Sequence, residues 1–348
     1  MNKRSKYGYY QPNRIQRTQR TILVIAVLVL LLLVGLLISI NTGQTPIPLG
    51  DVIRTLFGIG EPKDELIIME FRLPRILITM LAGAGLSAAG AVLQGVTRNG
   101  LADPGILGIN AGAGLGVVLF ITLNSLRADA SPLVMPLMAL IGAMGAAAVI
   151  YAFAYRRHKG LSATRLLLAG IAVAAGLQSL TMILSIRLDP QNYTFVANWL
   201  AGSIWGTNWA FVLALLPWIL VLLPFILWKS KELNVLQLGD QLAAGLGSSI
   251  HRQRLGLLAA AVALSAACVS ISGAINFLGL VGPHLARRLV GPRHEHLVPV
   301  SALIGALLLL VSDCIGRWVM QPSEIPTGIV VAVIGAPYFL FLLYKARK

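Results

Sequence analysis

Long apolar segments decide which folds this chain of 348 residues can adopt. A run of nearly pure Leu, Val and Ile at residues 21–40 is the first of them. About twenty apolar residues cross a bilayer as one helix, whereas lipid leaves the backbone of an open sheet unpaired. The short alternating segments of a membrane β-barrel are absent. The sequence therefore predicts an all-α polytopic membrane protein with about ten transmembrane helices, at 21–40, 76–96, 106–124, 133–155, 164–186, 207–228, 255–272, 274–290, 298–316 and 326–344.

The composition supports this interpretation. Apolar side chains make up 57% of the chain and charged ones 12%, and the mean hydropathy is +0.79, which excludes an ordinary soluble globule. A basic tail at residues 1–20 precedes the first apolar run. That run is too long for a signal-peptide core and has no small-residue cleavage site. We expect it to remain as the first helix of a single transmembrane domain, residues 21–348.

The net charge of +15 is distributed by side of the membrane. If the chain begins inside and crosses ten times, the inner segments hold 21 of the 28 lysines and arginines. Most acidic residues then fall in the outer segments. Because positively charged loops stay in the cytoplasm, both termini are predicted to be cytoplasmic. The basic balance reflects this topology and does not indicate a nucleic-acid partner.

A hydrophilic stretch at residues 229–254 separates the first six predicted helices (21–228) from the last four (255–344). Four of its leucines recur at helical spacing: Leu236, Leu238, Leu242 and Leu246. Because glycines such as Gly239 interrupt the run, the pattern predicts two short amphipathic helices at the cytoplasmic membrane face. Their apolar stripe needs a cover, which could be lipid headgroups or a partner protein.

No residue pattern indicates an enzyme. The nucleotide-binding pattern GxxxxGK[ST] and the zinc-protease pattern HExxH are absent, and no Ser, His and acid combination is suggested by spacing. Cys268 and Cys314 both lie in apolar runs, so we interpret them as packing residues. We expect no catalytic residue, no cofactor and no bound metal in this chain.

The predicted helices contain few ionisable residues, and the notable ones lie near the outer side. Helix middles carry almost none, although ion-coupled carriers need them there. Asp313 lies one helical turn before Arg317, so a local ion pair and a transport role both remain open for it. Arg72 and Arg75, in the outer sequence RLPR, oppose the cytoplasmic bias of the other cations. They suit either lipid phosphate or the carboxylates of a partner protein.

Five segments, in order along the chain, carry recognisable motifs: RLPR at 72–75, AGAGLSAAGAVLQGVTRNGLADPGILGINAGAG at 82–114, LQLGDQLAAGLG at 236–247, SGAINFLGLVGPHLARRLVG at 272–291 and DCIGRWVMQPSEIPTGIVVAVIGAPYFLFLLYK at 313–345. Together they resemble the iron-chelate uptake permease family of ABC importers, which includes the cobalamin permease. The resemblance extends from about residue 20 to the C-terminus. The chain departs from the family at Gly100, where proline is usual, and at Gly282, where a bulky residue is common.

The resemblance implies a cobalamin-permease-like fold in the cell membrane and roles for three groups of residues. The coupling group, which would contact a soluble ATPase, comprises Leu238, Gly239, Asp240, Ala243, Ala244 and Gly247. The docking group, which would receive acidic residues of an extracytoplasmic substrate-binding protein, comprises Arg72, Arg75 and Arg317. The cytoplasmic gate would include Leu161, Ser162 and Thr164.

The resemblance also implies the function: import of an iron–siderophore complex into the cytoplasm, with ATP bound and hydrolysed on a separate ATPase dimer. A second permease subunit, identical or paralogous, would complete the pathway. Cobalamin or haem is an alternative cargo within the same family. An autonomous secondary carrier is the alternative from another class, and it would need no ATPase partner.

Overall fold

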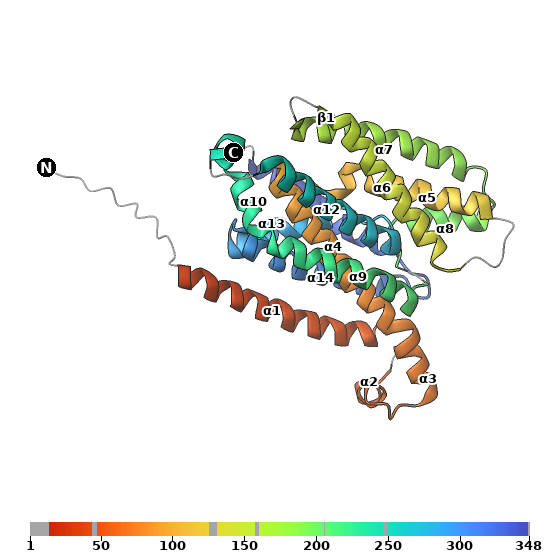
Figure 1. Ribbon diagram of the computed structural model, residues 1–348. Helices are drawn as coiled ribbons and strands as arrows, with labels where there is room; N and C mark the ends of the chain where they lie inside the picture. The colour runs from red at the N-terminus through yellow and green to blue at the C-terminus, as the bar shows by residue number, and fades with distance from the viewer. Residues whose placement is uncertain are drawn as a thin grey trace.

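The computed structural model describes residues 14–43, 47–124, 131–156, 160–204, 206–245 and 249–346. Its helices lie side by side in one bundle (Figure 1). All ten expected helices are present: α1 (Arg14–Asn41), α4 (Leu73–Thr97), α5 (Ile109–Asn124), α6 (Val134–Ala154), α7 (Ala163–Ser185), α9 (Trp209–Trp228), α12 (Ile250–Ser272), α13 (Leu278–Val290), α14 (His294–Val319) and α15 (Thr327–Ala346). Among the described residues, eight helices are long and apolar enough to cross a membrane.

Helix α4 forms the centre of the bundle and packs against α12, α13 and α14 (Figure 1). Its glycines and alanines let neighbouring backbones approach closely, as small residues do between membrane helices. A Cβ at Gly83 would lie 2.8 Å from the carbonyl carbon of Gly305 in α14. The thiol of Cys268 is buried beside Gly85, which confirms its interpretation as a packing residue.

Helix α1 runs along one edge of the bundle and leaves most of its Leu, Ile and Val side chains exposed (Figure 1). Only 17% of its most apolar window is buried. In water this face would be strongly unfavourable, whereas lipid tails accept it without cost. The helix therefore has the surface expected of an anchor in contact with lipid.

Helices α5 and α13 are shorter than predicted, with 16 and 13 residues. The predicted helix from 106 begins instead with a 3-10 turn, η2 (Pro104–Leu107), because proline and the left-handed Gly108 prevent a continuous helix. Residues 273–277, between α12 and α13, are likewise not helical although the predicted helix began at 274. The two irregular segments meet where Asn110 Nδ2 donates a hydrogen bond to Asn276 Oδ1 at 2.9 Å. Interrupted helices at matching places in two halves are typical of transporters built from inverted repeats.

The outer segments contain more helix than their sequence pattern indicates. The prolines at 46, 48 and 62 predict an irregular loop with one short helix over residues 41–75. The structure instead has α2 (Leu49–Leu56), α3 (Pro62–Glu65) and the π-helix η1 (Leu66–Arg72), which continues directly into α4. Residues 187–206 connect two predicted helices and read from the sequence as an outer loop, but they contain α8 (Pro190–Leu200). On the opposite side, a small hairpin joins α6 to α7 through β1 (Tyr155–Arg156) and β2 (Gly160–Leu161).

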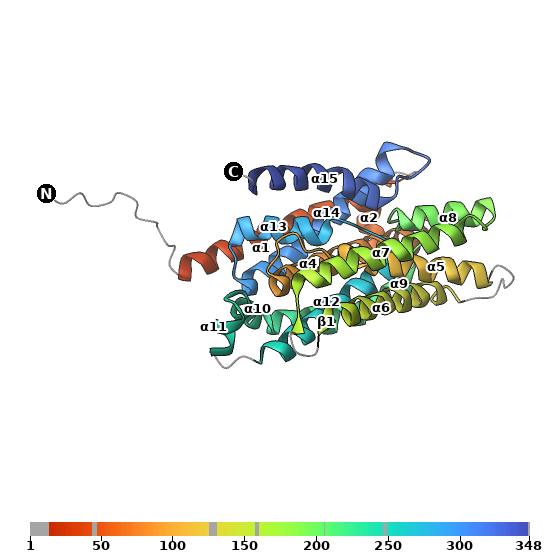
Figure 2. The ribbon, with the colours of Figure 1, turned by 90° about the horizontal axis from the view of Figure 1, so that it is seen from above.

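The two ends of the bundle differ. The predicted pair of short helices is confirmed as α10 (Ser230–Gln237) and α11 (Asp240–Gly245). They lie at the same end as the start of α1 and the end of α15, while α2, α3 and α8 lie at the other end (Figures 1 and 2). We call these the α10 end and the α8 end. The charge argument above predicts that the α10 end is the cytoplasmic one.

Candidate functional site

The hydrophilic stretch folds into a bent pair of helices, because Gly239 between α10 and α11 has φ +108°, a conformation that favours glycine. Helix α10 is fixed to the bundle through Leu233 and Leu236, which are fully buried. Beyond the bend, Leu238 and Leu242 point outward with 54% and 62% of their surface exposed. The leucine stripe is thus divided between the bundle and an outer surface.

Asp240, at the start of α11, connects this pair to two other helices. Its Oδ1 accepts hydrogen bonds from Arg254 Nη2 of α12 at 2.8 Å and from Arg98 Nη2 at the end of α4. Arg98 also donates through Nε to the carbonyl of Leu236 at 2.8 Å. Burial alone would raise the pKa of Asp240, but the hydrogen bonds and charges of Arg254 and Arg98 outweigh it and lower the pKa. The carboxylate therefore stays ionised and orients α11.

The remaining members of the predicted coupling group have different environments. The side chain of Ala243 is fully buried within this chain, so in this conformation it faces the bundle and not a partner. Ala244 belongs to α11, and Gly247 lies outside the described residues. The outward surface at this end is therefore formed by Leu238, Asp240 and Leu242, the last of which the predicted group did not include.

A second connection joins α10 to the first turn of α14. Asn234 Oδ1 accepts hydrogen bonds from the backbone N–H and from Nδ1 of His294, both at 2.9 Å. Asn234 Nδ2 donates to Glu295 Oε2 at 2.7 Å. His294 is fully buried against Gly95 of α4. Helix α10 is thus attached to α14 by a polar side chain and to α4 by Arg98.

At the α8 end, Asp313 of α14 is the centre of a buried ionic cluster. Its Oδ2 accepts from Arg317 Nε at 3.0 Å, which confirms the local ion pair that the spacing indicated. Its Oδ1 accepts from Arg75 Nη2 at 2.9 Å and from Thr327 Oγ1 at 3.1 Å. Arg75 also pairs with Glu324 at 2.8 Å. The cluster joins α4, α14 and the start of α15.

All three predicted docking arginines make contacts within the chain at the α8 end. Arg72 and Arg317 are only 8% and 6% exposed, and both donate to backbone carbonyls near the end of α1. Arg75 is the most accessible, with 14% of its side chain exposed. Its partner Glu324 is 31% exposed. A docking protein would therefore meet Arg75 and Glu324 before either of the other two arginines.

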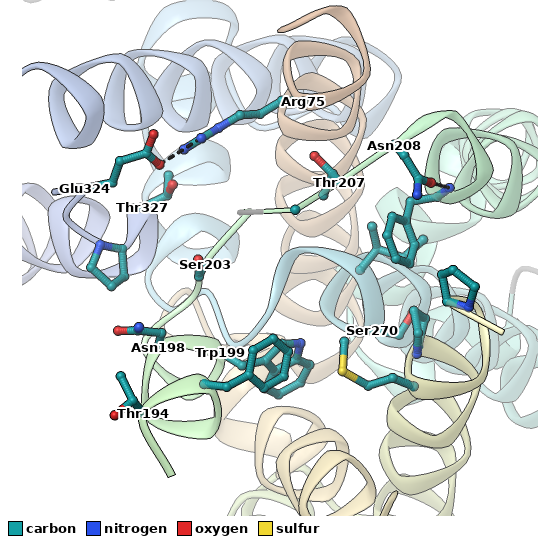
Figure 3. Close-up of a pocket in the computed structure, with 18 of the residues that line it drawn as sticks. Arg75, Thr194, Asn198, Trp199, Ser203, Thr207, Asn208, Ser270, Glu324 and Thr327 are labelled. Carbon is teal, nitrogen blue, oxygen red and sulfur yellow. Dashed lines mark hydrogen bonds and ion pairs between the residues drawn. The ribbon is translucent and has the colours of Figure 1, made fainter. Parts of the chain in front are cut away.

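A cavity of about 1070 Å³ opens at the α8 end (Figure 3). Its lining comes from both ends of α8, from the beginnings of α4, α6, α9 and α15, and from the last turns of α5 and α12. Uncharged polar and aromatic side chains prevail, and the Arg75–Glu324 pair is on one wall. The described residues contain no group of three or more His, Cys, Asp or Glu side chains that could hold a metal ion.

Helix α8 and its contribution to this cavity were missed from the sequence. From the sequence, Trp199 and Trp205 suit the aromatic belt found at a membrane interface. In the structure Trp199 is 4% exposed and lines the cavity, because the helix turns it inward. Trp205 lies outside the described residues. A signal was present: Asp189 followed by Pro190 is typical of a helix start, and the Asp189 side chain accepts from the backbone N–H of Gln191 and of Asn192.

The predicted gate residues lie in and just after the β1–β2 hairpin, at the α10 end. Leu161 is in β2, paired with Tyr155, and Ser162 precedes the first residue of α7. Thr164 is in the first turn of α7 and is exposed. Their gating role stays a prediction.

Comparisons with known proteins agree with this architecture. Residues 31–345 match the FecCD transport family. The chain is 50% identical over 337 residues to the iron(3+)-hydroxamate import system permease protein FhuG of Bacillus subtilis, covering 95% of this chain and 99% of that protein. It is 39% identical to the Fe(3+) dicitrate transport system permease protein FecD of Escherichia coli, over 89% of this chain and 95% of that one. A solved inward-facing structure of a metal-chelate type ABC transporter superposes with a TM-score of 0.82 at 31% identity, covering 93% of this chain and 99% of its own.

Proposed function

Because this chain belongs to the FecCD transport family, we propose that its cargo is an iron(III) chelate of the siderophore type. The chain is a multi-pass permease subunit of an ABC importer and not an enzyme. The observation that carries the cargo assignment is the 50% identity, over 95% of this chain, to a permease for iron(3+)-hydroxamate. The Escherichia coli relative is named for another iron(III) chelate, the dicitrate complex.

Energy is supplied by a separate pair of ATPase subunits, which bind at the α10 end. The sequence lacks the pattern that cradles nucleotide phosphates. Leu238 and Leu242 offer an exposed apolar surface beside the Asp240 carboxylate. Removal of such apolar surface from water favours association with a partner. Gly239 gives the bend that separates this surface from the buried part of α10.

Force from the ATPase reaches the bundle through the two connections of the bent pair. Arg98 links it to α4, and Asn234 links it to α14. These two helices pack at the Gly83–Gly305 contact and carry Arg75 and Asp313 at their other ends. Nucleotide binding then favours one of two packed arrangements of the bundle, and hydrolysis returns it to the other. In this topology both termini are cytoplasmic.

Delivery takes place at the α8 end, where a substrate-binding protein docks. In the conformation described, all three docking arginines are engaged within the chain. Docking therefore requires an exchange of partners, and Glu324 is the acidic group most easily replaced, because it is the more exposed of the two that hold Arg75. A carboxylate of the binding protein takes its place on Arg75, while Arg72 and Arg317 hold the framework.

The exchange is tested by measuring the affinity of the loaded binding protein for Glu324→Gln and Arg75→Gln importers in nanodiscs. Glu324→Gln removes the competing carboxylate, so docking strengthens. Arg75→Gln removes the shared cation, so docking weakens. Weaker docking of Glu324→Gln would show that Glu324 itself contacts the binding protein and would contradict the exchange.

The other partner is a second permease subunit, identical or paralogous. Helices α7 and α15 expose continuous apolar faces, including Leu168, Ile171, Val333 and Leu340. Lipid or a second subunit accepts such faces, and the cargo pathway of a paired importer needs the second subunit.

The function is tested with proteoliposomes that contain the permease, its ATPase and internal ATP, with the binding protein outside. Radioactive iron supplied as a siderophore complex accumulates against its gradient, and cobalamin and haem do not compete. Asp240→Arg, which reverses the charge that holds Arg98 and Arg254, abolishes uptake and weakens retention of the ATPase. Uphill uptake by the permease alone would instead establish a secondary carrier, and preferred uptake of cobalamin or haem would reassign the cargo.

A further inference from the structure

Helix α2 and the turn that follows it carry a compact apolar surface at the α8 end of the bundle. Phe57 and Ile59 are 79% and 75% exposed, and Ile53, one helical turn before Phe57, is also exposed. The turn is closed by two backbone hydrogen bonds, from Phe57 N to the carbonyl of Ile53 and from Ile59 N to that of Arg54. We call Ile53, Phe57 and Ile59 the α2 patch. Large apolar side chains that are exposed together mark a contact surface for a protein or a membrane.

The opposite face of α2 is fixed to the bundle. Val52 and Thr55 on that face are almost fully buried. Val52 packs in one apolar cluster with Ile40 at the end of α1 and Ile68 of η1. Because this face already supplies the contacts that hold α2 in place, the α2 patch is a second apolar surface. It is presented outward at a fixed position relative to α1.

The position of α2 indicates what covers the patch. Figure 1 shows α2 level with the end of α1 and extending past α1, away from the rest of the bundle. Near that end, α1 exposes Leu33, Leu37 and Ile38, the side chains of its lipid-facing surface. Since lipid tails cover this surface of α1, a segment that extends past its end lies over the lipid headgroups. The α2 patch is therefore continuous with the lipid-facing surface and lies at the depth of the membrane interface.

Helix α3, the next element, has the opposite surface character. Glu61, Lys63 and Glu65, at its start and along it, are exposed. In Figure 1, α3 lies farther than α2 from the α10 end. The segment is thus apolar in its part nearer the centre of the membrane and charged in its part farther out. This order matches the change in polarity from lipid tails through headgroups to water.

From this arrangement we propose that α2 and its following turn are an interfacial anchor, which inserts the α2 patch into the lipid leaflet at the α8 end. Interfacial helices bury their apolar face by about 5–10 Å at the boundary of headgroups and acyl chains. The apolar stem of Arg54 lies on the same helix, and its guanidinium extends to a lipid phosphate. Its exposed pair with Asp51, at 3.6 Å, is weak enough to be exchanged. Because η1 packs on α2 and continues into α4, the anchor also sets the depth of Arg75 in the membrane.

Spin labels on introduced cysteines test the insertion, with the permease and its ATPase reconstituted in phosphatidylcholine vesicles. The variants are Phe57→Cys, Ile59→Cys and, as the matched control, Lys63→Cys on the charged helix α3. Each label is exposed to oxygen, which concentrates in lipid, and to a water-soluble nickel chelate. Labels at 57 and 59 favour oxygen and lie about 5–10 Å below the lipid phosphates, whereas the label at 63 favours the nickel chelate. Preference for the nickel chelate at all three positions would overturn the proposal. Wild-type protein treated with the same label gives the background from Cys268 and Cys314.

A substitution beside the label tests whether Phe57 itself holds the anchor in lipid. With the label at position 59, Phe57→Ser shifts the label toward water, because the patch loses its largest apolar side chain. Phe57→Trp restores the depth, since tryptophan is favoured at membrane interfaces. Gel filtration checks that each variant is folded. An unchanged depth in Phe57→Ser would contradict insertion of Phe57.

The substrate-binding protein is the other candidate occupant of the α2 patch. The loaded binding protein is therefore added to the labelled vesicles. Unchanged oxygen accessibility at positions 57 and 59 supports the anchor, because lipid already covers both side chains. Loss of accessibility to both reagents would instead assign the patch to the docking surface, and the anchor would be excluded.

Discussion

The contact between Gly83 and Gly305 offers the sharpest test of the proposed connection between α4 and α14. In a Gly83→Ala variant, the new Cβ would lie 2.8 Å from the carbonyl carbon of Gly305 and 2.9 Å from Cα of Ala306, and closer still to the Gly305 oxygen. Ordinary contact begins at 3.4 Å. All three obstacles are backbone atoms, so a side-chain rotation cannot relieve the clash, and the helices must separate by roughly 0.6 Å or more.

That separation weakens packing along the whole interface, because a gap of about 0.5–1 Å already removes a quarter to a half of a van der Waals contact. Overpacking in a tight interior costs about 1–3 kcal/mol. The matched control is Gly145→Ala in α6, where no atom lies within 4 Å of the new Cβ. There the greater helix propensity of alanine stabilises by about 0.5–1 kcal/mol.

The assay is reversible denaturant unfolding in mixed micelles, together with ATP-dependent iron uptake at a temperature where both variants stay folded. Gly83→Ala lowers stability and uptake, and Gly145→Ala raises stability and leaves uptake unchanged. Equal stability changes in the two variants would refute the argument from close packing. A destabilised Gly83→Ala importer with normal uptake would refute the role of the contact in transmission.

Three further predictions follow from single contacts. Leu242→Asp leaves the unfolding free energy within about 0.5 kcal/mol of wild type, because the side chain is exposed. The ATPase no longer co-purifies with this variant. Retained ATPase would show that Leu242 is not part of the ATPase-binding surface. Asp313→Asn destabilises by about 3–5 kcal/mol in the same unfolding assay, because the buried Arg317 and the half-buried Arg75 lose the carboxylate that they share. Glu324→Gln costs less than about 1 kcal/mol, because Glu324 is partly exposed. Equal losses in the two variants would contradict the buried cluster. Asp189→Ala speeds hydrogen exchange at the first turn of α8, because it removes the side chain that caps this helix. The hydrogen bonds of the cap lower the pKa of Asp189, so in the wild type the protection holds at neutral pH and disappears as the pH falls through that pKa. Protection that is independent of pH would rule out the cap.

Some of the functional geometry could be predicted because it depends on neighbours in sequence. The pair of Asp313 and Arg317 is four residues apart on one helix, so its spacing alone indicated the contact. The two short helices at 229–254 follow from leucine spacing and glycine breaks. Helix α8 could also have been found, because its start signal is a local Asp-Pro pattern.

The other contacts join residues that are far apart in the chain. Arg75 reaches Asp313 and Glu324 across 238 and 249 residues, and Arg98 reaches Asp240 across 142. No periodicity or motif in the sequence indicates contacts between residues so far apart in the chain. For the same reason the sequence could not show that the docking arginines are engaged within the chain, or that Ala243 faces the bundle.

The sequence by itself determined that this chain crosses the membrane many times and that its hydrophilic stretch forms a bent helix pair, because both depend on local hydropathy and backbone freedom. Tertiary structure alone decided which arginine is accessible, which leucines remain outward and where the cavity at the α8 end opens. Exposure and charge balance are properties of assembled helix ends, and those ends become neighbours only when the bundle packs.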